Sequence, residues 1–522
     1  MSFSSWSFLL FFSVFSVLYG CNTKLFKSIF LNKILLFTAS CVFYLWAGLK
    51  NFPFLLFTII TGFFGGILSE TRKSEKQKNI ILVFVILINL FMLIVFKYTN
   101  FLISTINSIL HGKVHFSTVS LILPLGISFY VFQLISYLLD VKRGIIKAER
   151  NLLNFALYLL YFPQLIQGPI ERYGNLAKEF NVLPSFDYIR ITNGLKRIGW
   201  GLLKKLYIAD FFGLYVNDVY SNVQSASSLS IILATVFYAV QIYADFSGYM
   251  DVAIGASEIL GIKISENFNH PYFSKTIAEF WRRWHITLGA WFKDYLFYPV
   301  FRSCNDKMGK KLRKHGYKKL SKKLPQVISL IVVWSSTGLW HGASWTFVLW
   351  GLWHGFFIII ESLFEKKSNQ VKTKLGITDS SGFAFFQVIR TFIIVCIGYS
   401  FFRANSFTDL CIIIRKVSFI FSEISQLVSN YFALNHNEFR EYFREVFMLI
   451  NFNYHDMLKA FIIIIVLTII SFNTQNKTGF EIVSSKNILI RWILYSIVIL
   501  LSFSALIDLN SGLHTSFIYN QF

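Results

Sequence analysis

Apolar runs of about twenty residues, nearly free of charge, recur along the 522-residue chain. A run of this length can cross a bilayer core of about 30 Å as a helix. Backbone polar groups in lipid must be hydrogen-bonded within their own segment, so such runs predict helices. We therefore expect an all-α polytopic integral membrane protein with roughly 11–14 transmembrane helices, joined by short loops and by re-entrant or interfacial helices.

Twelve candidate spans can be delimited from the apolar pattern. The five nearest the N-terminus are the clearest, at residues 5–20, 33–49, 53–68, 79–96 and 119–139. Seven more follow, at residues 152–170, 229–249, 325–340, 345–360, 385–402, 457–470 and 492–507. Composition agrees with this pattern, since 55% of the residues are hydrophobic, which is high for a soluble protein.

The formal net charge of +23 would also suit a nucleic-acid-binding protein. The cations, however, gather in alternate short loops, as the positive-inside rule requires of cytoplasmic loops. The loops after the first, third and fifth spans contain Lys24, Lys27, Lys33, Arg72, Lys73, Lys76, Lys78, Lys142, Arg143, Lys147 and Arg150. We therefore expect no nucleic-acid partner, an extracytoplasmic N-terminus, and a cytoplasmic location for the most basic loop, residues 302–323.

The chain is interpreted as one membrane domain with four parts. These are N-terminal spans at 1–140, a core with re-entrant segments at 141–402, an extramembrane insertion at 424–456, and C-terminal spans with a tail at 457–522. In the core, residues 163–173 and 243–251 place Pro or Gly beside polar groups, which predicts helix breaks around a cavity. Residues 193–212 mix lysines with apolar residues and are expected along the membrane interface.

Two histidines, His341 and His354, lie in the nearly uncharged stretch STGLWHGASWTFVLWGLWHG, residues 336–355. A neutral imidazole can accept and return a proton near neutral pH. An ionisable side chain at membrane depth is a candidate functional group, and the alternative is a hydrogen-bonded packing residue between helices. The two histidines are thirteen residues apart, so one helix face would not present both closely.

A third histidine, His285, lies in EFWRRWHITLGAWFKDYLFYPV, residues 279–300, between tryptophans and cations. Alternating aromatics and cations are typical of an interfacial or re-entrant helix. The functional alternative is a cavity wall whose arginines face an anionic donor.

Four motifs follow one another along the chain: FPQLIQGPIERY, QIYADFSGYMDVAIG, EFWRRWHITL and GLWHGASWTFVLWGLWHG. Together with the opening MSFSSWSFLLFF and the later FFRA, they resemble the membrane-bound O-acyltransferase family. The resemblance is to its bacterial branch, which includes the membrane subunit of alginate O-acetylation and a peptidoglycan O-acetyltransferase.

The resemblance implies a fold with a central tunnel, where a cytoplasmic acyl thioester meets an acceptor hydroxyl from outside. His341 matches the family's catalytic histidine and is implied to be the general base. His285 matches a second histidine, implied to position or polarise the thioester. His354 is expected to be structural. The candidate tunnel residues are Arg282, Arg283, Trp340 and Asp245.

The chain ends FIYNQF, residues 517–522. A terminal aromatic cluster is often an interfacial anchor. It also resembles the C-terminal hexapeptide of this bacterial branch, in which a tyrosine is proposed to carry the acyl group. Tyr519 matches that tyrosine, whereas Asn520 replaces the expected Phe. Lys486 and Arg491 before the last span predict an extracytoplasmic tail.

The resemblance thus implies an O-acetyltransferase of the bacterial inner membrane that modifies an extracytoplasmic polysaccharide, such as an alginate-like polymer or peptidoglycan. Acetyl-CoA is the implied donor, with an acyl-carrier thioester, as in teichoic acid D-alanylation, as the alternative. A periplasmic SGNH-type O-acetyltransferase or esterase is the implied partner. The five cysteines show no metal-ligand spacing, so no metal is expected.

Two other classes of protein remain open from the residues alone. A transporter would fit the spans, although Asp245, Asp251 and Glu258 form the only acidic cluster near span depth and no repeat is visible. A scaffold could recruit cell-wall enzymes through residues 424–456.

Overall fold

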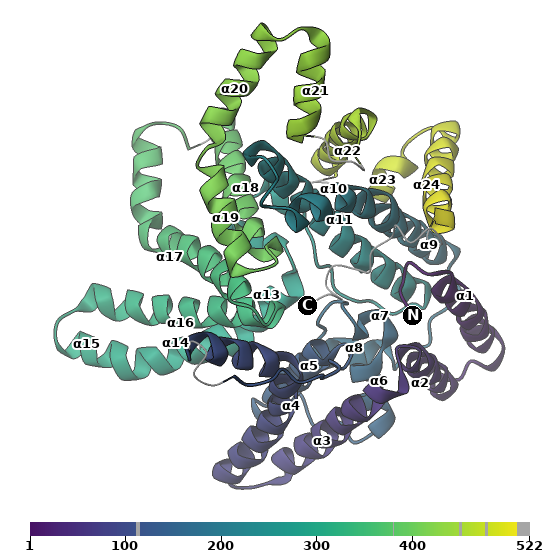
Figure 1. The fold of residues 1–522 in the computed structure, drawn as a ribbon. Helices are drawn as coiled ribbons and strands as arrows, with labels where there is room; N and C mark the ends of the chain where they lie inside the picture. The colour runs from purple at the N-terminus through teal and green to yellow at the C-terminus, as the bar shows by residue number, and fades with distance from the viewer. Residues whose placement is uncertain (111–114, 379, 448–451, 475–478, 509–522) are drawn as a thin grey trace. The chain divides into compact units, whose positions relative to one another are not determined.

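The structure is a computed structural model that describes residues 1–110, 115–378, 380–447, 452–474 and 479–508. Helices form almost all of the regular structure in these parts (Figure 1). Within them, the one β-type pairing is an isolated bridge between Phe268 and Trp284. The all-α fold predicted from the apolar runs is confirmed.

Eight helices in the described parts of the chain are long and apolar enough to cross a membrane. They are Trp6–Phe26, Leu49–Thr71, Glu75–Ile109, Ser228–Ile259, Trp345–Lys374, Ser381–Arg403, Tyr454–Asn473 and Ile488–Ile507. The number is smaller than expected because several of the other apolar runs form shorter or divided helices.

The chain folds as two compact units. Unit 1 comprises Met1–Gly201, Tyr249–Asn267 and Thr287–Leu296. Its helices are α1 (Trp6–Cys21), α2 (Ile29–Leu45), α3 (Phe52–Thr71), α4 (Glu75–Ile109), α5 (Ile127–Lys142), α6 (Leu152–Leu160), α7 (Phe162–Leu165), α8 (Tyr173–Glu179), α9 (Tyr188–Leu202) and most of α13 (Ile286–Phe292).

Unit 2 comprises Leu202–Gly248, Phe268–Ile286 and Phe297–Phe522. The long helix α11 (Ser228–Ile259) begins in this unit and ends in unit 1. The other helices of unit 2 are α10 (Asp210–Ser221), α12 (Ile277–Arg283), α14 (Tyr298–Cys304), α15 (Lys310–Lys314), α16 (Lys318–His341), α17 (Trp345–Lys374), α18 (Ser381–Arg403), α19 (Phe407–Val417), α20 (Ile420–Ala433), α21 (His436–Phe447), α22 (Tyr454–Asn473), α23 (Gly479–Ser484) and α24 (Ile488–Asp508).

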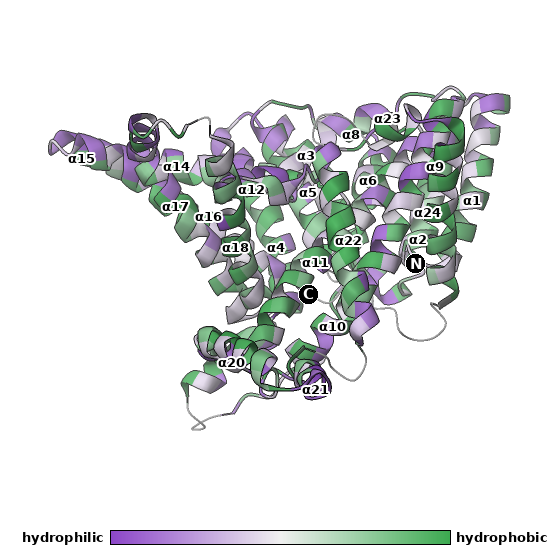
Figure 2. Ribbon diagram, turned by 90° about the horizontal axis from the view of Figure 1, so that it is seen from above, coloured by the Kyte–Doolittle hydropathy of each residue, from purple (hydrophilic) through white to green (hydrophobic). Residues whose placement is uncertain are grey.

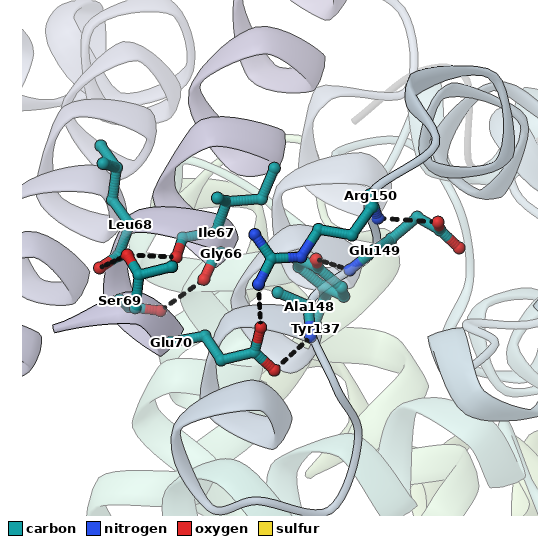
Figure 3. Close-up of polar contacts among 10 residues, drawn as sticks. Gly66, Ile67, Leu68, Ser69, Glu70, Tyr137, Ala148, Glu149 and Arg150 are labelled. Atoms are coloured by element: carbon teal, nitrogen blue, oxygen red, sulfur yellow. Dashed lines mark hydrogen bonds and ion pairs between the residues drawn. The ribbon is translucent and has the colours of Figure 1, made fainter.

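The end of α3 and the basic loop after α5 lie side by side in unit 1. Glu70, at the end of α3, pairs with Arg150 at 2.5 Å and accepts the Ala148 N–H at 3.0 Å (Figure 3). The Tyr137 hydroxyl accepts the N–H of Glu149 at 2.9 Å in the same place. These contacts join the end of the third span to the loop after α5, in agreement with the charge pattern.

Two predicted spans differ from the observed helices for local reasons. Residues 119–139 were expected to be helical throughout, but α5 begins only at Ile127, after Pro124 and after Gly126 with φ +73°. The run 152–170 is divided, because α6 ends at Leu160 and α7 covers only Phe162–Leu165. The break predicted at residues 163–173 is confirmed, since the chain between α7 and α8 is irregular.

The second predicted break, at residues 243–251, is wrong. Helix α11 continues through this segment without interruption, with Gly248 in its interior. An interior glycine costs only about 1 kcal/mol relative to alanine. The packing of a helix with 67% of its most apolar window buried outweighs that cost.

The most basic segment, residues 302–323, is largely helical. It contains the end of α14, a π-helix at Asn305–Gly309, α15 and the start of α16. Figure 2 shows this end of unit 2 as strongly hydrophilic, at α15. The predicted insertion at 424–456 includes most of α20 and all of α21.

Candidate active site

His341 is the last residue of α16 and lies in an aromatic pocket of unit 2. Its side chain is only 4% exposed. The ring centroids of Trp340, Trp350 and Phe402 lie 4.9, 4.8 and 5.4 Å from the imidazole. Three helices, α16, α17 and α18, therefore hold this histidine in an apolar environment.

Glycines on α16 and α17 allow the two helices to approach closely enough to form this pocket. A Cβ added at Gly338 would lie 2.4 Å from the carbonyl oxygen of Phe347. The side chain of Ser344 accepts the N–H of Thr346 at 3.3 Å and caps α17. Small residues at such crossings are typical of helix pairs in membranes.

His354 lies one turn beyond Trp350 on α17 and is fully buried. The ring of Trp350 is 5.3 Å from His354, and it also contacts His341. Trp281 of α12 lies 5.0 Å away on another side. On a single helix, two histidines thirteen residues apart would not lie close together. Here the chain turns between α16 and α17, so that His341 and His354 both contact the same tryptophan, Trp350. Among the described residues, neither ring nitrogen of His354 has a hydrogen-bond partner.

His285 lies at the junction of α12 and α13 and has φ +46°. Its side chain is 1% exposed, with the ring of Phe246 at 4.7 Å and that of Trp340 at 6.0 Å. Burial lowers the pKa of His285 to about 3, so this imidazole is neutral at physiological pH. Trp340 therefore contacts both His285 and His341.

Comparison with known proteins identifies the family. The model of the MBOAT, membrane-bound O-acyltransferase, family matches residues 146–402, which include all three histidines. The chain is 34% identical over 415 residues to the probable alginate O-acetylase AlgI of Pseudomonas syringae pv. tomato, covering 78% of this chain and 73% of that protein. The chain belongs to the membrane-bound O-acyltransferase family. It is an enzyme of the O-acyltransferase class.

Two other members of the family differ in the reaction that their names describe. The chain is 32% identical over 400 residues to the peptidoglycan O-acetyltransferase of Helicobacter pylori, covering 72% of this chain and 71% of that protein. It is 29% identical over 300 residues to the teichoic acid D-alanyltransferase of Bacillus subtilis, covering 57% and 73%. The family is thus clear, while acyl group and acceptor differ among its members.

Of the candidate tunnel residues of this membrane-bound O-acyltransferase, Trp340 and Asp245 are buried. Asp245 forms an ion pair at 2.9 Å with Lys205, which pairs at the same distance with Asp210. Arg282 is exposed, and Arg283 pairs with Glu279 at 2.7 Å on the same helix. Trp340 therefore contacts His285 and His341, whereas Asp245 is buried in an ion-pair cluster with Lys205; a tunnel lined by these residues stays a prediction.

The expectation that residues 193–212 lie along the membrane interface is wrong for Lys204 and Lys205. Lys205 is 2% exposed, and Lys204 donates to the Ser247 hydroxyl at 2.9 Å in the protein interior. Both belong to a π-helix, Leu203–Ala209, and single-turn π-helices often mark functional sites. The two lysines were noted in the sequence, but the pairing of Lys205 with acidic residues was not. Asp245 is forty residues away along the chain, and Asp210 lies just beyond the π-helix.

Sequence reasoning did not single out Phe246, Trp350 or Phe402 as contacts of the histidines. The only signal at each was its place in a quoted motif: Phe246 lies in QIYADFSGYMDVAIG, Trp350 in GLWHGASWTFVLWGLWHG and Phe402 in FFRA. Tyr519 and the FIYNQF tail lie outside the described residues. No group of three or more His, Cys, Asp or Glu side chains that could hold a metal occurs in the described parts of the chain.

Proposed function

We propose that this enzyme transfers acetyl groups from a cytoplasmic thioester to hydroxyl groups of an extracytoplasmic polysaccharide, with His341 as the general base. The observation that carries the proposal is the burial of His341 in an aromatic pocket, within the segment that matches the family. The relatives named as an alginate O-acetylase and a peptidoglycan O-acetyltransferase support acetyl as the acyl group. Acetyl-CoA is the proposed donor.

In the proposed reaction, the neutral imidazole of His341 takes the proton of the acceptor hydroxyl. The hydroxyl oxygen attacks the carbonyl carbon of the thioester, a C–O bond forms, and the C–S bond breaks. The departing thiolate takes the proton back from the imidazolium, so the products are an ester and a free thiol. A positioned base of this kind contributes about 10²–10⁴-fold to a rate.

His285 is proposed as a positioning group for the thioester. A neutral imidazole can donate one hydrogen bond to the carbonyl oxygen, where negative charge develops in the transition state. The low pKa of His285 supports this role rather than that of a cation. Trp340, which contacts both histidines, would separate the base from the positioning group by one ring.

The second candidate is transfer of a D-alanyl group from an acyl-carrier protein. The relative named as a teichoic acid D-alanyltransferase favours it, and the same base chemistry would apply. The higher identity to the two O-acetylation proteins favours acetyl transfer. Membership of an acyltransferase family disfavours a transporter or scaffold without catalysis.

The proposed location is the bacterial inner membrane, with both termini extracytoplasmic. The alternating basic loops support this orientation. Tyr519 would receive the acetyl group outside and pass it to an SGNH-type partner enzyme. In the alternative, the tail is an interfacial anchor, and removal of the Tyr519 hydroxyl would leave transfer unchanged.

The test is the amount of acetyl ester on isolated polysaccharide from cells that contain each variant at equal membrane abundance. His341→Ala should abolish the ester, whereas the matched control His315→Ala, an exposed histidine near α15, should leave it unchanged. Wild-type ester levels in His341→Ala would refute the catalytic assignment. Loss of ester in Tyr519→Phe would support the relay, and D-alanyl ester in place of acetyl would support the second candidate.

A further inference from the structure

Helices α20 and α21, which we call the hairpin, are tied to the start of α11 by polar contacts on one side. The Oε1 atom of Glu423 accepts the Ser228 N–H at 3.0 Å and the Ser228 hydroxyl at 2.7 Å. Its Oε2 atom accepts the Leu229 N–H at 3.1 Å. On α21, the carbonyl oxygen of Val446 accepts the Ser227 hydroxyl at 3.0 Å. These bonds fix which face of the hairpin points toward α11.

The opposite face of α20 carries no charge, because Glu423 is the only charged residue of this helix. Phe421 and Phe432 on α20 are 82% and 80% exposed. A groove of about 380 Å³ runs between the two helices and is lined by Leu427, Val428, Tyr431, Phe432 and Phe439. Every lining side chain is apolar or aromatic, which suits a hydrocarbon chain.

The charges of the hairpin are concentrated on α21, whose charged residues are Glu438, Arg440, Glu441, Arg444 and Glu445. An interfacial helix has one charged face and one apolar, aromatic face, and the hairpin provides these two kinds of surface on its two helices. Aromatic side chains are enriched at that depth because their rings suit the headgroup region.

The position of the hairpin in unit 2 favours lipid as the occupant of the uncharged face. Figure 1 shows α20 and α21 projecting outward past α18 and α22, and Figure 2 shows them beyond the ends of these two spans. Helices α18 and α22 are long and apolar enough to cross a membrane, and their apolar side chains Ile393 and Ile465 are exposed, as expected of a surface in contact with lipid. The hairpin therefore lies at the edge of the exposed apolar surface of two candidate spans.

We propose that the hairpin is an interfacial anchor, in which the uncharged face of α20 lies in the headgroup region and its groove takes a phospholipid acyl chain. Through Glu423, this anchor fixes the start of α11 at the membrane surface. Helix α11 also carries Phe246, which packs on His285. The inference does not depend on the acyl group, the donor or the base, and its test does not use activity.

The experiment replaces single residues by the photo-crosslinking amino acid p-benzoylphenylalanine in the full-length protein, irradiates native membranes, and identifies adducts by mass. The test position is Phe432. Ile465, on the exposed face of α22, is the positive control for lipid contact. Glu441, exposed on charged α21, is the control for a position in water.

We expect a phospholipid adduct at Phe432 with a yield close to that at Ile465 and several times that at Glu441. A polypeptide adduct as the main product at Phe432 would overturn the proposal in favour of a protein-docking surface. A yield of lipid adduct at Phe432 no higher than at Glu441 would overturn it as well, because the face would then lie in water. The same adducts should form in His341→Ala, whatever that change does to transfer.

Discussion

Gly351 of α17 faces the backbone of α16 at the closest approach of the two helices that form the pocket of His341. A Cβ added there would lie 2.2 Å from the carbonyl oxygen of Trp334, whereas ordinary contact begins at 3.4 Å. Gly351→Ala therefore requires a separation of about 1.2 Å, the difference between 3.4 and 2.2 Å. A backbone oxygen cannot rotate away as a flexible side chain can, so the helices themselves must move.

The expected effects follow from this displacement. Overpacking of a close contact typically costs about 1–3 kcal/mol of stability. Trp334 and His341 lie two turns apart on the same helix, so a shift of α16 moves the imidazole with it. Misplacement of a catalytic group by about 1 Å can lower a rate about 10²-fold. We expect activity to fall more steeply than stability.

The assay pairs acetyl-ester formation at equal membrane abundance with the unfolding temperature of the purified enzyme in detergent. Gly382→Ala is the matched control, because a Cβ at Gly382 on α18 would meet only the Ser380 hydroxyl, at 3.8 Å. The control should behave as wild type. Wild-type activity and unfolding temperature in Gly351→Ala would refute the view that the tight approach of α16 and α17 positions His341.

Three further predictions concern groups outside this helix pair. Lys205→Met leaves the buried carboxylates of Asp210 and Asp245 without their shared cation and should lower stability by about 3–5 kcal/mol, measured as a lower unfolding temperature and folded yield. Glu423→Ala removes the acceptor at the start of α11 and should cost about 0.5–2 kcal/mol, with faster amide exchange at residues 228–230. Burial raises the pKa of Glu149, but hydrogen bonds to its carboxylate lower that pKa by more than burial raises it. The folded pKa therefore lies below the ordinary value of 4.5. Its stabilising effect is complete above that value and is lost as pH falls through the folded pKa, and Glu149→Gln should flatten this part of the stability–pH curve.

Hydropathy predicted the existence of the long spans because a segment in lipid must be apolar and must satisfy its own backbone hydrogen bonds as a helix. It was less successful where protein, rather than lipid, surrounds the helix. Helix α5 is buried along most of its length and tolerates Gln133 and Asp140, and its start is set by Gly126 rather than by an apolar boundary. The same burial lets α11 continue through Gly248, where local composition predicted a break.

The candidate site was located by motif and then assembled by tertiary contacts that no spacing reveals. His285, His341 and His354 were all identified from the sequence, and their burial agrees with a role in the interior. The contacts of Trp350 with His341 and His354, and of Phe402 with His341, depend on how three helices pack. The lysines of the π-helix show the opposite error, since their charge suggested a surface position, whereas Lys205 pairs with Asp210 and Asp245, and Lys204 donates to Ser247, in the interior.

The backbone at His285 carries a penalty that side-chain substitutions can measure. Its φ of +46° places a residue with a Cβ in the left-handed region, at a cost of roughly 1–2 kcal/mol. Alanine keeps the Cβ, so His285→Ala removes the ring and leaves the backbone penalty in place. Glycine would remove the ring and the penalty together. After the roughly 0.5–1 kcal/mol that glycine loses in unfolded-chain entropy relative to alanine is added back, the difference in unfolding free energy between these two variants gives the conformational energy held at the α12–α13 junction, separately from whatever the imidazole contributes to acyl transfer.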